Sequence, residues 1–220
     1  FCESILPHLC AAGVEIPVIV GLPSTVSEDQ LKGLGSAAAS AGSVAMFHAV
    51  GCTPEAPTME AALGGMPPTR TIVVDMADVR AARDQLSTTE TRQLGAVSLG
   101  TPHYSLSEFE LLVNQLGGRS IHPDVHMYVS TGRDVLHVVE QRGWAQELTR
   151  SGVQLVADTC TYITPIIAER PGAVMTDSAK WAYYAPSNLG LDVIFGSLED
   201  CVESAVRGRV SRDESGWTDG

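Results

Sequence analysis

Residues 96–118 read AVSLGTPHYSLSEFELLVNQLGG and predict a strand, a loop and a helix in succession. The strand is the apolar run Ala96 to Leu99, and the loop after it contains both glycine and proline. Ser105 and Glu108 have the spacing of a capping box, which marks the start of a helix that ends at the glycine pair 117–118. A strand that leads through a short loop into a helix is the repeating unit of α/β folds.

The same alternation extends along the chain in both directions. Strand-like runs occupy residues 18–21, 44–50, 71–74, 126–130, 153–157, 173–176 and 191–195, and helix-like segments occupy residues 27–41, 76–86, 134–142 and 198–206. We therefore predict an α/β fold with a mostly parallel sheet and flanking helices. One domain over residues 1–210 is the preferred organisation, followed by a polar tail or linker at 211–220. Two small sheets are the alternative.

Composition limits the partners of this chain. The 220 residues are 44% hydrophobic, which excludes a disordered chain, and 14 Lys and Arg against 26 Asp and Glu give a net charge of −12. Because no cluster of Lys or Arg stands out in the sequence, we expect no nucleic-acid partner. No apolar run is long enough to span a bilayer and no secretory signal is visible, so we expect a cytoplasmic protein. The first residue is Phe1, and we expect a longer protein.

Polar or thiol side chains follow five of the strand-like runs. Cysteines stand at positions 52, 160 and 201, whereas His103 follows the run 96–99, and Ser178 and Lys180 follow the run 173–176. The carboxyl ends of parallel strands line one edge of an open α/β sheet, where ligands bind. The sequence therefore predicts a single site at this edge.

Three cysteines from three loops suggest an iron–sulfur cluster. Thiolates of Cys52, Cys160 and Cys201 would bind three corners and leave one iron open as a Lewis acid for a hydroxyl group. The alternatives are inert buried cysteines, or a zinc enzyme that uses Cys52, Cys160 and a histidine. We expect Cys2 and Cys10 to lie far from this site.

Five motifs in order resemble the aconitase X family. They are VGCTPEAPT (50–58), LGTPHYS (99–105), DTC (158–160), TDSAKWAYYAP (176–186) and FGSLEDC (195–201). The resemblance runs from about Ile16 to Val210 and implies an aconitase-like fold, the C-terminal half of the family's large cluster-binding region. It places an N-terminal half and a small swivelling domain outside this chain.

The resemblance also implies an activity. Members of the family are iron–sulfur hydro-lyases that dehydrate small hydroxy acids, either cis-3-hydroxy-L-proline to Δ1-pyrroline-2-carboxylate or mevalonate 5-phosphate. The cluster type, [2Fe-2S] or [4Fe-4S], stays open. The catalytic base is expected outside this chain, so we expect the chain alone to be inactive. A non-catalytic α/β scaffold subunit is the competing function.

The family's ligand pattern differs here at one position. Other members carry Cys where this sequence has Thr101, and the archaeal type often lacks the thiol at Cys52. The resemblance therefore implies a ligand set of Cys52, Cys160 and Cys201, with sulfur atoms roughly 4 to 7 Å apart. We expect His103, Ser178 and Lys180 to bind substrate. A single obvious cation, Lys180, suits a small zwitterion better than a phosphate dianion.

Overall fold

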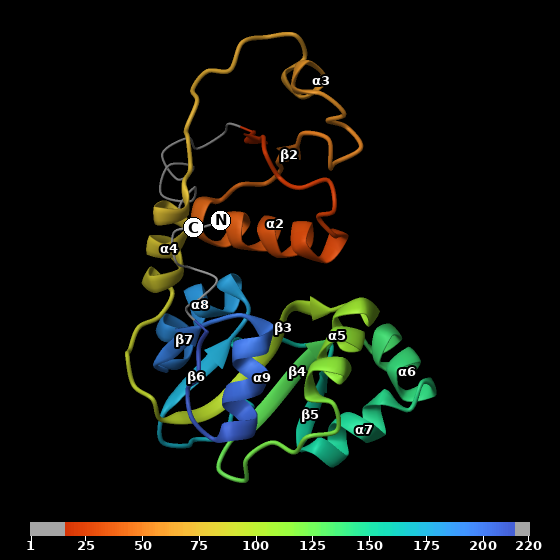
Figure 1. Cartoon of the computed structure of the whole chain (residues 1–220), viewed down its shortest axis with the longest axis vertical. Helices are drawn as coiled ribbons and strands as arrows, with labels where there is room; N and C mark the ends of the chain where they lie inside the picture. Colours follow the sequence, from red (N-terminus) through yellow and green to blue (C-terminus); the bar gives the residue numbers. More distant parts are fainter. Residues whose placement is uncertain (1–15, 214–220) are drawn as a thin grey trace. The chain divides into compact units, whose positions relative to one another are not determined.

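The computed structural model describes residues 16–213, which divide between two compact units, residues 1–82 and 83–220 (Figure 1). Each unit has a sheet of its own, with two strands in the first and five in the second. The region expected as one domain, residues 1–210, thus contains two units. Cys2, Cys10 and the end of the expected tail lie outside the described residues.

The first unit contains a two-stranded parallel sheet. Strand β1 (Val18–Ile19) pairs with β2 (His48–Ala49), and helix α2 (Glu28–Gly42) connects them. The predicted capping box at the start of α2 is confirmed: the Ser27 hydroxyl accepts from the Gln30 amide, and the Gln30 side chain accepts from the Ser27 amide. Helix α3 (Met59–Leu63) follows β2.

The predicted strand at residues 71–74 is wrong. This run belongs to neither sheet, and the Val73 side chain is 86% exposed. A β-branched run forms a strand only where a second strand and a covering layer receive it. The helix predicted next is confirmed as α4 (Met76–Gln85), which spans the boundary between the units.

The second unit is built on a five-stranded, fully parallel sheet with the order β5-β4-β3-β6-β7. Its strands are β3 (Leu94–Tyr104), β4 (His126–Thr131), β5 (Val153–Ala157), β6 (Ala173–Thr176) and β7 (Val193–Phe195). The central strand β3 has eight consecutive buried residues at its start. Such continuous burial is typical of a parallel strand that is covered on both faces.

Helices cover both faces of this sheet (Figure 1). One face packs against α5 (Leu106–Leu116), α6 (Arg133–Gln141), α7 (Trp144–Ser151) and α9 (Leu198–Arg207), and the other packs against α8 (Ala179–Leu189). Successive side chains of β3 point to opposite faces of the sheet and so pack in both layers. Val97 and Leu99 belong to the first core cluster, and Ala96 belongs to the second, around Trp181. The sequence predicts the α/β class correctly.

Helices α7 and α8 are not predicted by the sequence analysis. Residues 179–189 read as a loop in the sequence, and a proline is normally excluded from the interior of a helix. The structure instead places Pro186 within α8, whose first turn is capped by the Ser178 hydroxyl. Trp181 lies in this helix and is completely buried.

The two ends of β3 are both unusual. Near its carboxyl end, Gly100 has φ +84°, and a Cβ there would come within 3.0 Å of backbone atoms of Ser130. The peptide bond between Thr101 and Pro102, just after Gly100, is cis. Before its amino end, Gln93 forms an antiparallel bridge with Arg209, and the Val210 amide donates to the Arg92 carbonyl at 3.0 Å.

None of the helices within residues 16–213 is both long and apolar enough to cross a bilayer.

Candidate active site

Loops and helix N-termini gather at the carboxyl ends of the strands in the second unit. Helices α5, α6, α8 and α9 begin within a few residues of the ends of β3, β4, β6 and β7. Three of them are capped by serine hydroxyls, from Ser105, Ser178 and Ser197. Because free N–H groups at helix N-termini carry partial positive charge, this edge favours an anionic ligand.

Ser178 connects the end of β6 with the part of β3 that follows Gly100. Its hydroxyl donates to the Thr101 carbonyl and accepts from the Trp181 amide at 3.0 Å. The residue is buried, and both hydrogen-bonding functions of its hydroxyl are occupied. Its expected contact with substrate stays a prediction.

The segment after β5 crosses to the central strand. The Thr161 hydroxyl lies 2.6 Å from the Ser98 hydroxyl of β3 and accepts from the Trp181 indole at 2.7 Å. One residue before Cys160, the Thr159 carbonyl lies 3.3 Å from His103 Nε2. The structure therefore brings the backbone beside Cys160 to His103, although their strands are not neighbours.

Lys180 is a half-buried cation without a counter-charge. It is the second residue of α8, and its side chain makes no ion pair or hydrogen bond in the part of the chain that the structure describes. A lysine held in this way is available to a carboxylate ligand. Its substrate role stays a prediction.

A buried acidic cluster lies beneath this edge. Tyr104, at the end of β3, donates to Asp177, just after β6, at 2.5 Å. Burial, followed by the nearby Asp177 carboxylate, raises the pKa of Tyr104 well above its ordinary value. Burial raises the pKa of the completely buried Cys201 thiol in the same way, and the Asp177 and Asp200 charges raise it further.

The sequence analysis does not single out this Tyr104–Asp177 pair. A signal was nevertheless present, because Tyr104 comes five residues after the run 96–99 and Asp177 directly after the run 173–176, and these runs become the neighbouring strands β3 and β6. Residues at the same end of paired parallel strands are close in space.

The chemistry of the three predicted ligands suits an iron–sulfur cluster. Cys52, Cys160 and Cys201 are all free thiols, the ligand type that such clusters require. Thr101 Oγ1 and Ser130 Oγ are buried without a hydrogen-bond partner among residues 16–213. Buried hydroxyls are normally satisfied, so a polar group held at this edge would remove a free-energy cost.

The expected convergence of three thiols stays a prediction. Cys160 and Cys201 belong to the second unit, whereas Cys52 belongs to the first, where it is half-buried with Sγ 3.7 Å from the Pro23 carbonyl oxygen. Within the described residues, no group of three or more His, Cys, Asp or Glu is close enough to hold one metal ion. A buried protonated Cys201 must lose its proton to bind iron.

Together, the parallel sheet with helices on both faces and the thiol and hydroxyl groups at its carboxyl edge define an α/β domain of the aconitase type. The family model for the aconitase X third domain matches residues 94–207, and the model for the aconitase X second domain matches residues 10–84. The chain belongs to the aconitase X family.

Named relatives support this assignment. The chain is 39% identical to cis-3-hydroxy-L-proline dehydratase from Pseudomonas aeruginosa, over 96% of this chain and 37% of the relative. It is 37% identical to the enzyme of that name from Hypocrea jecorina, over 90% of this chain and 34% of the relative. It is 34% identical to the phosphomevalonate dehydratase large subunit of Methanothermobacter thermautotrophicus, over 85% of this chain and 44% of that subunit. The chain thus spans about a third of the first two relatives.

A solved structure has the same fold. The crystal structure of aconitase X from Thermococcus kodakaraensis in its holo form superposes with a TM-score of 0.77. The match covers 93% of this chain and 51% of the other chain at 23% sequence identity.

Proposed function

We propose that this chain is part of an iron–sulfur hydro-lyase that dehydrates cis-3-hydroxy-L-proline to Δ1-pyrroline-2-carboxylate. The observation that carries the proposal is the identity of 39% and 37% to two proteins of that name over nearly the whole chain. Identity to the phosphomevalonate dehydratase large subunits is lower, from 34% down to 26%.

The cofactor would be held by Cys52, Cys160 and Cys201. When bound, a cluster with one iron free of protein ligands supplies a Lewis acid that assists departure of a hydroxyl group. The two unpartnered hydroxyls of Thr101 and Ser130 would then donate to groups held at the edge.

Substrate recognition would fall to Lys180 and His103. Lys180 is uncompensated among the described residues, and we assign to it the substrate carboxylate. His103, fixed against the Thr159 carbonyl, would orient a polar group of the substrate. Ser178 holds the Thr101 loop and positions both of them. The general base would come from the regions that this chain lacks relative to the longer dehydratases.

The test uses a chimera in which this chain replaces the matching third of the Pseudomonas dehydratase. After anaerobic purification, we expect visible absorbance from bound iron–sulfur and turnover of cis-3-hydroxy-L-proline. Cys52→Ser, Cys160→Ser and Cys201→Ser should each abolish the absorbance, and Cys10→Ser serves as the control. A colourless but folded chimera would contradict the cofactor, and a coloured chimera without turnover would contradict the substrate.

The second candidate substrate is mevalonate 5-phosphate. It is favoured by five phosphomevalonate dehydratase large subunits at 26–34% identity. In the five strand-end motifs the structure offers a phosphate dianion one free cation, Lys180, where several donors are usual. Preferential turnover of mevalonate 5-phosphate by the chimera would establish this candidate and overturn the first.

A further inference from the structure

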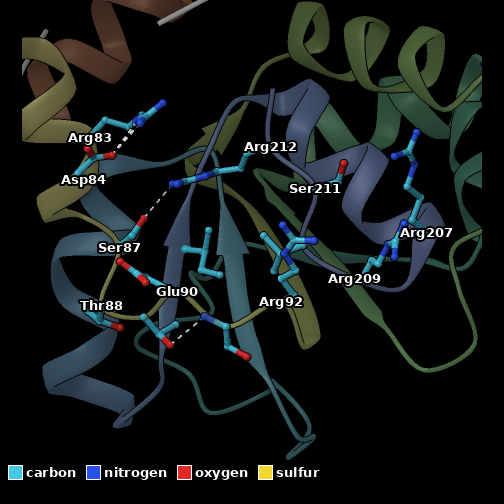
Figure 2. Close-up of a pocket in the computed structure, with 14 residues that line it drawn as sticks. Arg83, Asp84, Ser87, Thr88, Glu90, Arg92, Arg207, Arg209, Ser211 and Arg212 are labelled. Carbon is cyan, nitrogen blue, oxygen red and sulfur yellow. Dashed lines mark hydrogen bonds and ion pairs between the residues drawn. The ribbon is translucent and has the colours of Figure 1, made fainter. Parts of the chain in front are cut away.

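The second unit contains a cavity of about 890 Å³ whose lining includes no residue of the five strand-end motifs (Figure 2). Its wall comes from the segment before β3, from β7, and from the end of α9 with the residues that follow it. The lining residues are Arg83, Asp84, Ser87, Thr88, Thr89, Glu90, Thr91, Arg92, Ile194, Arg207, Arg209, Val210, Ser211 and Arg212. A cavity of this volume is in the range that takes a small organic molecule.

The cavity is strongly basic in an acidic chain. Five of the 14 Lys and Arg residues of the chain line it, against two carboxylates, Asp84 and Glu90. No cluster of basic residues is expected from the sequence, whereas the structure brings five arginines together around this cavity. The cluster is difficult to see in the sequence because its members come from segments more than a hundred residues apart.

Two of the five arginines, Arg92 and Arg209, come from paired backbone segments and have no side-chain partner among residues 16–213. The Gln93–Arg209 bridge and the hydrogen bond from the Val210 amide to the Arg92 carbonyl place Arg92 beside Arg209 in the backbone. Both residues are exposed, and neither side chain has a hydrogen bond or ion pair among residues 16–213. Figure 2 shows Arg92, Arg207 and Arg209 toward one side of the cavity and Arg83, Asp84 and Ser87 toward the other.

The remaining charges do not neutralise this pair. Arg83 is paired with Asp84 at 2.8 Å, and Arg207 with Glu203 at 2.5 Å. Arg212 Nη1 lies 3.3 Å from the Phe195 carbonyl oxygen and 3.4 Å from the Ser87 hydroxyl. Glu90 makes no ion pair with any arginine of the cavity within the described part of the chain. Arg92 and Arg209 are therefore the two arginines of the cavity whose side chains have no carboxylate or hydrogen-bond partner among residues 16–213.

We propose that this cavity binds a phosphate-bearing small molecule through Arg92 and Arg209. Guanidinium groups form paired, charge-assisted hydrogen bonds with phosphate oxygens, and a phosphate offers enough oxygens to accept from two arginines at once. The hydroxyls of Ser87, Thr88, Thr91 and Ser211 line the same cavity and supply neutral donors for the rest of the molecule. The phosphate comes either from an organic phosphate ester or from free inorganic phosphate.

The two arginines lie at the amino end of β3, although the cavity also reaches Phe195 at the end of β7 through Arg212. Arg92 precedes the amino end of β3, whereas Thr101 and His103 lie toward its carboxyl end. Arg92 and Thr101 are nine positions apart along β3 and the segment before it, which corresponds to at most about 30 Å at 3.3 Å per residue. The proposal therefore stands whatever the substrate of the dehydratase is.

The test is a titration of the full chain with inorganic phosphate and, separately, with glycerol 3-phosphate, followed by calorimetry at constant ionic strength. We expect saturable binding that weakens at least about tenfold in Arg92→Gln and in Arg209→Gln. Arg150→Gln is the matched control, because Arg150 lies in the same unit, in α7, and bonds the Gln146 carbonyl. This control should change affinity less than about twofold.

The two probes distinguish the sources of the phosphate. Tighter binding of glycerol 3-phosphate assigns the cavity to a phosphate ester, and equal or tighter binding of inorganic phosphate assigns it to the free ion. The proposal is overturned if neither probe saturates, if both arginine variants bind like wild type, or if citrate binds as tightly as the phosphates. Unchanged melting temperatures of the variants establish that lost affinity is not lost folding.

Discussion

Replacement of Gly100 by alanine tests how closely β3 approaches β4 near the carboxyl ends of the two strands. Gly100 has φ +84°, and an added Cβ would come within 3.0 Å of three backbone atoms of Ser130. A left-handed conformation costs a residue with a Cβ about 1–2 kcal/mol. Overpacking adds about 1–3 kcal/mol, because a backbone neighbour cannot move aside as a flexible side chain can. We expect a total loss of about 2–5 kcal/mol in the free energy of unfolding.

Gly118→Ala is the matched control for this experiment. Gly118 lies in the same unit at φ +75°, but a Cβ there would meet nothing within 4 Å. It should lose only the conformational part, about 1–2 kcal/mol. The difference between the two variants therefore isolates the contact with Ser130.

Urea unfolding followed by tryptophan fluorescence provides the measurement. Trp144 in α7 and Trp181 in α8 lie in the second unit, and the fluorescence change of these two residues reports on its unfolding. With a slope of about 2 kcal/mol per molar urea, Gly100→Ala should unfold about 0.5–1.5 M earlier than Gly118→Ala. Equal midpoints for the two variants would refute the close approach of β3 and β4 at this point.

Two further predictions concern the buried cluster under the same edge. Tyr104→Phe removes the 2.5 Å hydrogen bond to Asp177 and should lower the free energy of unfolding by about 1–3 kcal/mol, whereas Tyr183→Phe, at a 48% exposed position, should leave it unchanged. Thermal melting decides this, and equal melting temperatures would exclude a stabilising pair. Burial raises the pKa of the completely enclosed Cys201 thiol, so iodoacetamide at pH 8 should alkylate the half-buried Cys160 and spare Cys201 until urea is added. Peptide mass spectrometry reads the result, and rapid labelling of Cys201 in the folded chain would contradict its burial.

Local signals in the sequence predict many elements correctly. The capping boxes that begin at Ser27 and Ser105 locate the starts of α2 and α5, because a cap is a short-range hydrogen-bond pattern. The alternation of strands and helices predicts the α/β class for the same reason. The run 71–74 shows the limit of local signals, since its residues favour a strand but have no sheet to join.

Features that depend on tertiary packing are not predicted. Helix α8 forms although it contains Pro186, because the free energy gained by burial of Trp181 and by the Ser178 cap exceeds the cost of a proline in the helix. The candidate site is predicted as a set of strand ends, and the structure adds how they are joined. The hydrogen bonds of Ser178 to the Thr101 carbonyl and of Tyr104 to Asp177 link residues more than seventy positions apart, which no local pattern reveals.

The bridge between Gln93 and Arg209 also has a consequence for how this unit can be rearranged. The chain enters the five-stranded sheet and leaves its last helix at adjoining positions, joined by the Val210–Arg92 hydrogen bond. Domains whose termini adjoin tolerate insertion into a host loop and circular permutation, because a short linker closes the gap without distortion. The unit can therefore be reopened at an exposed loop or grafted into another polypeptide, provided that Leu86, Ser87 and Thr88, which pack against and hydrogen-bond to it, are kept with the segment from Arg92 to Val210.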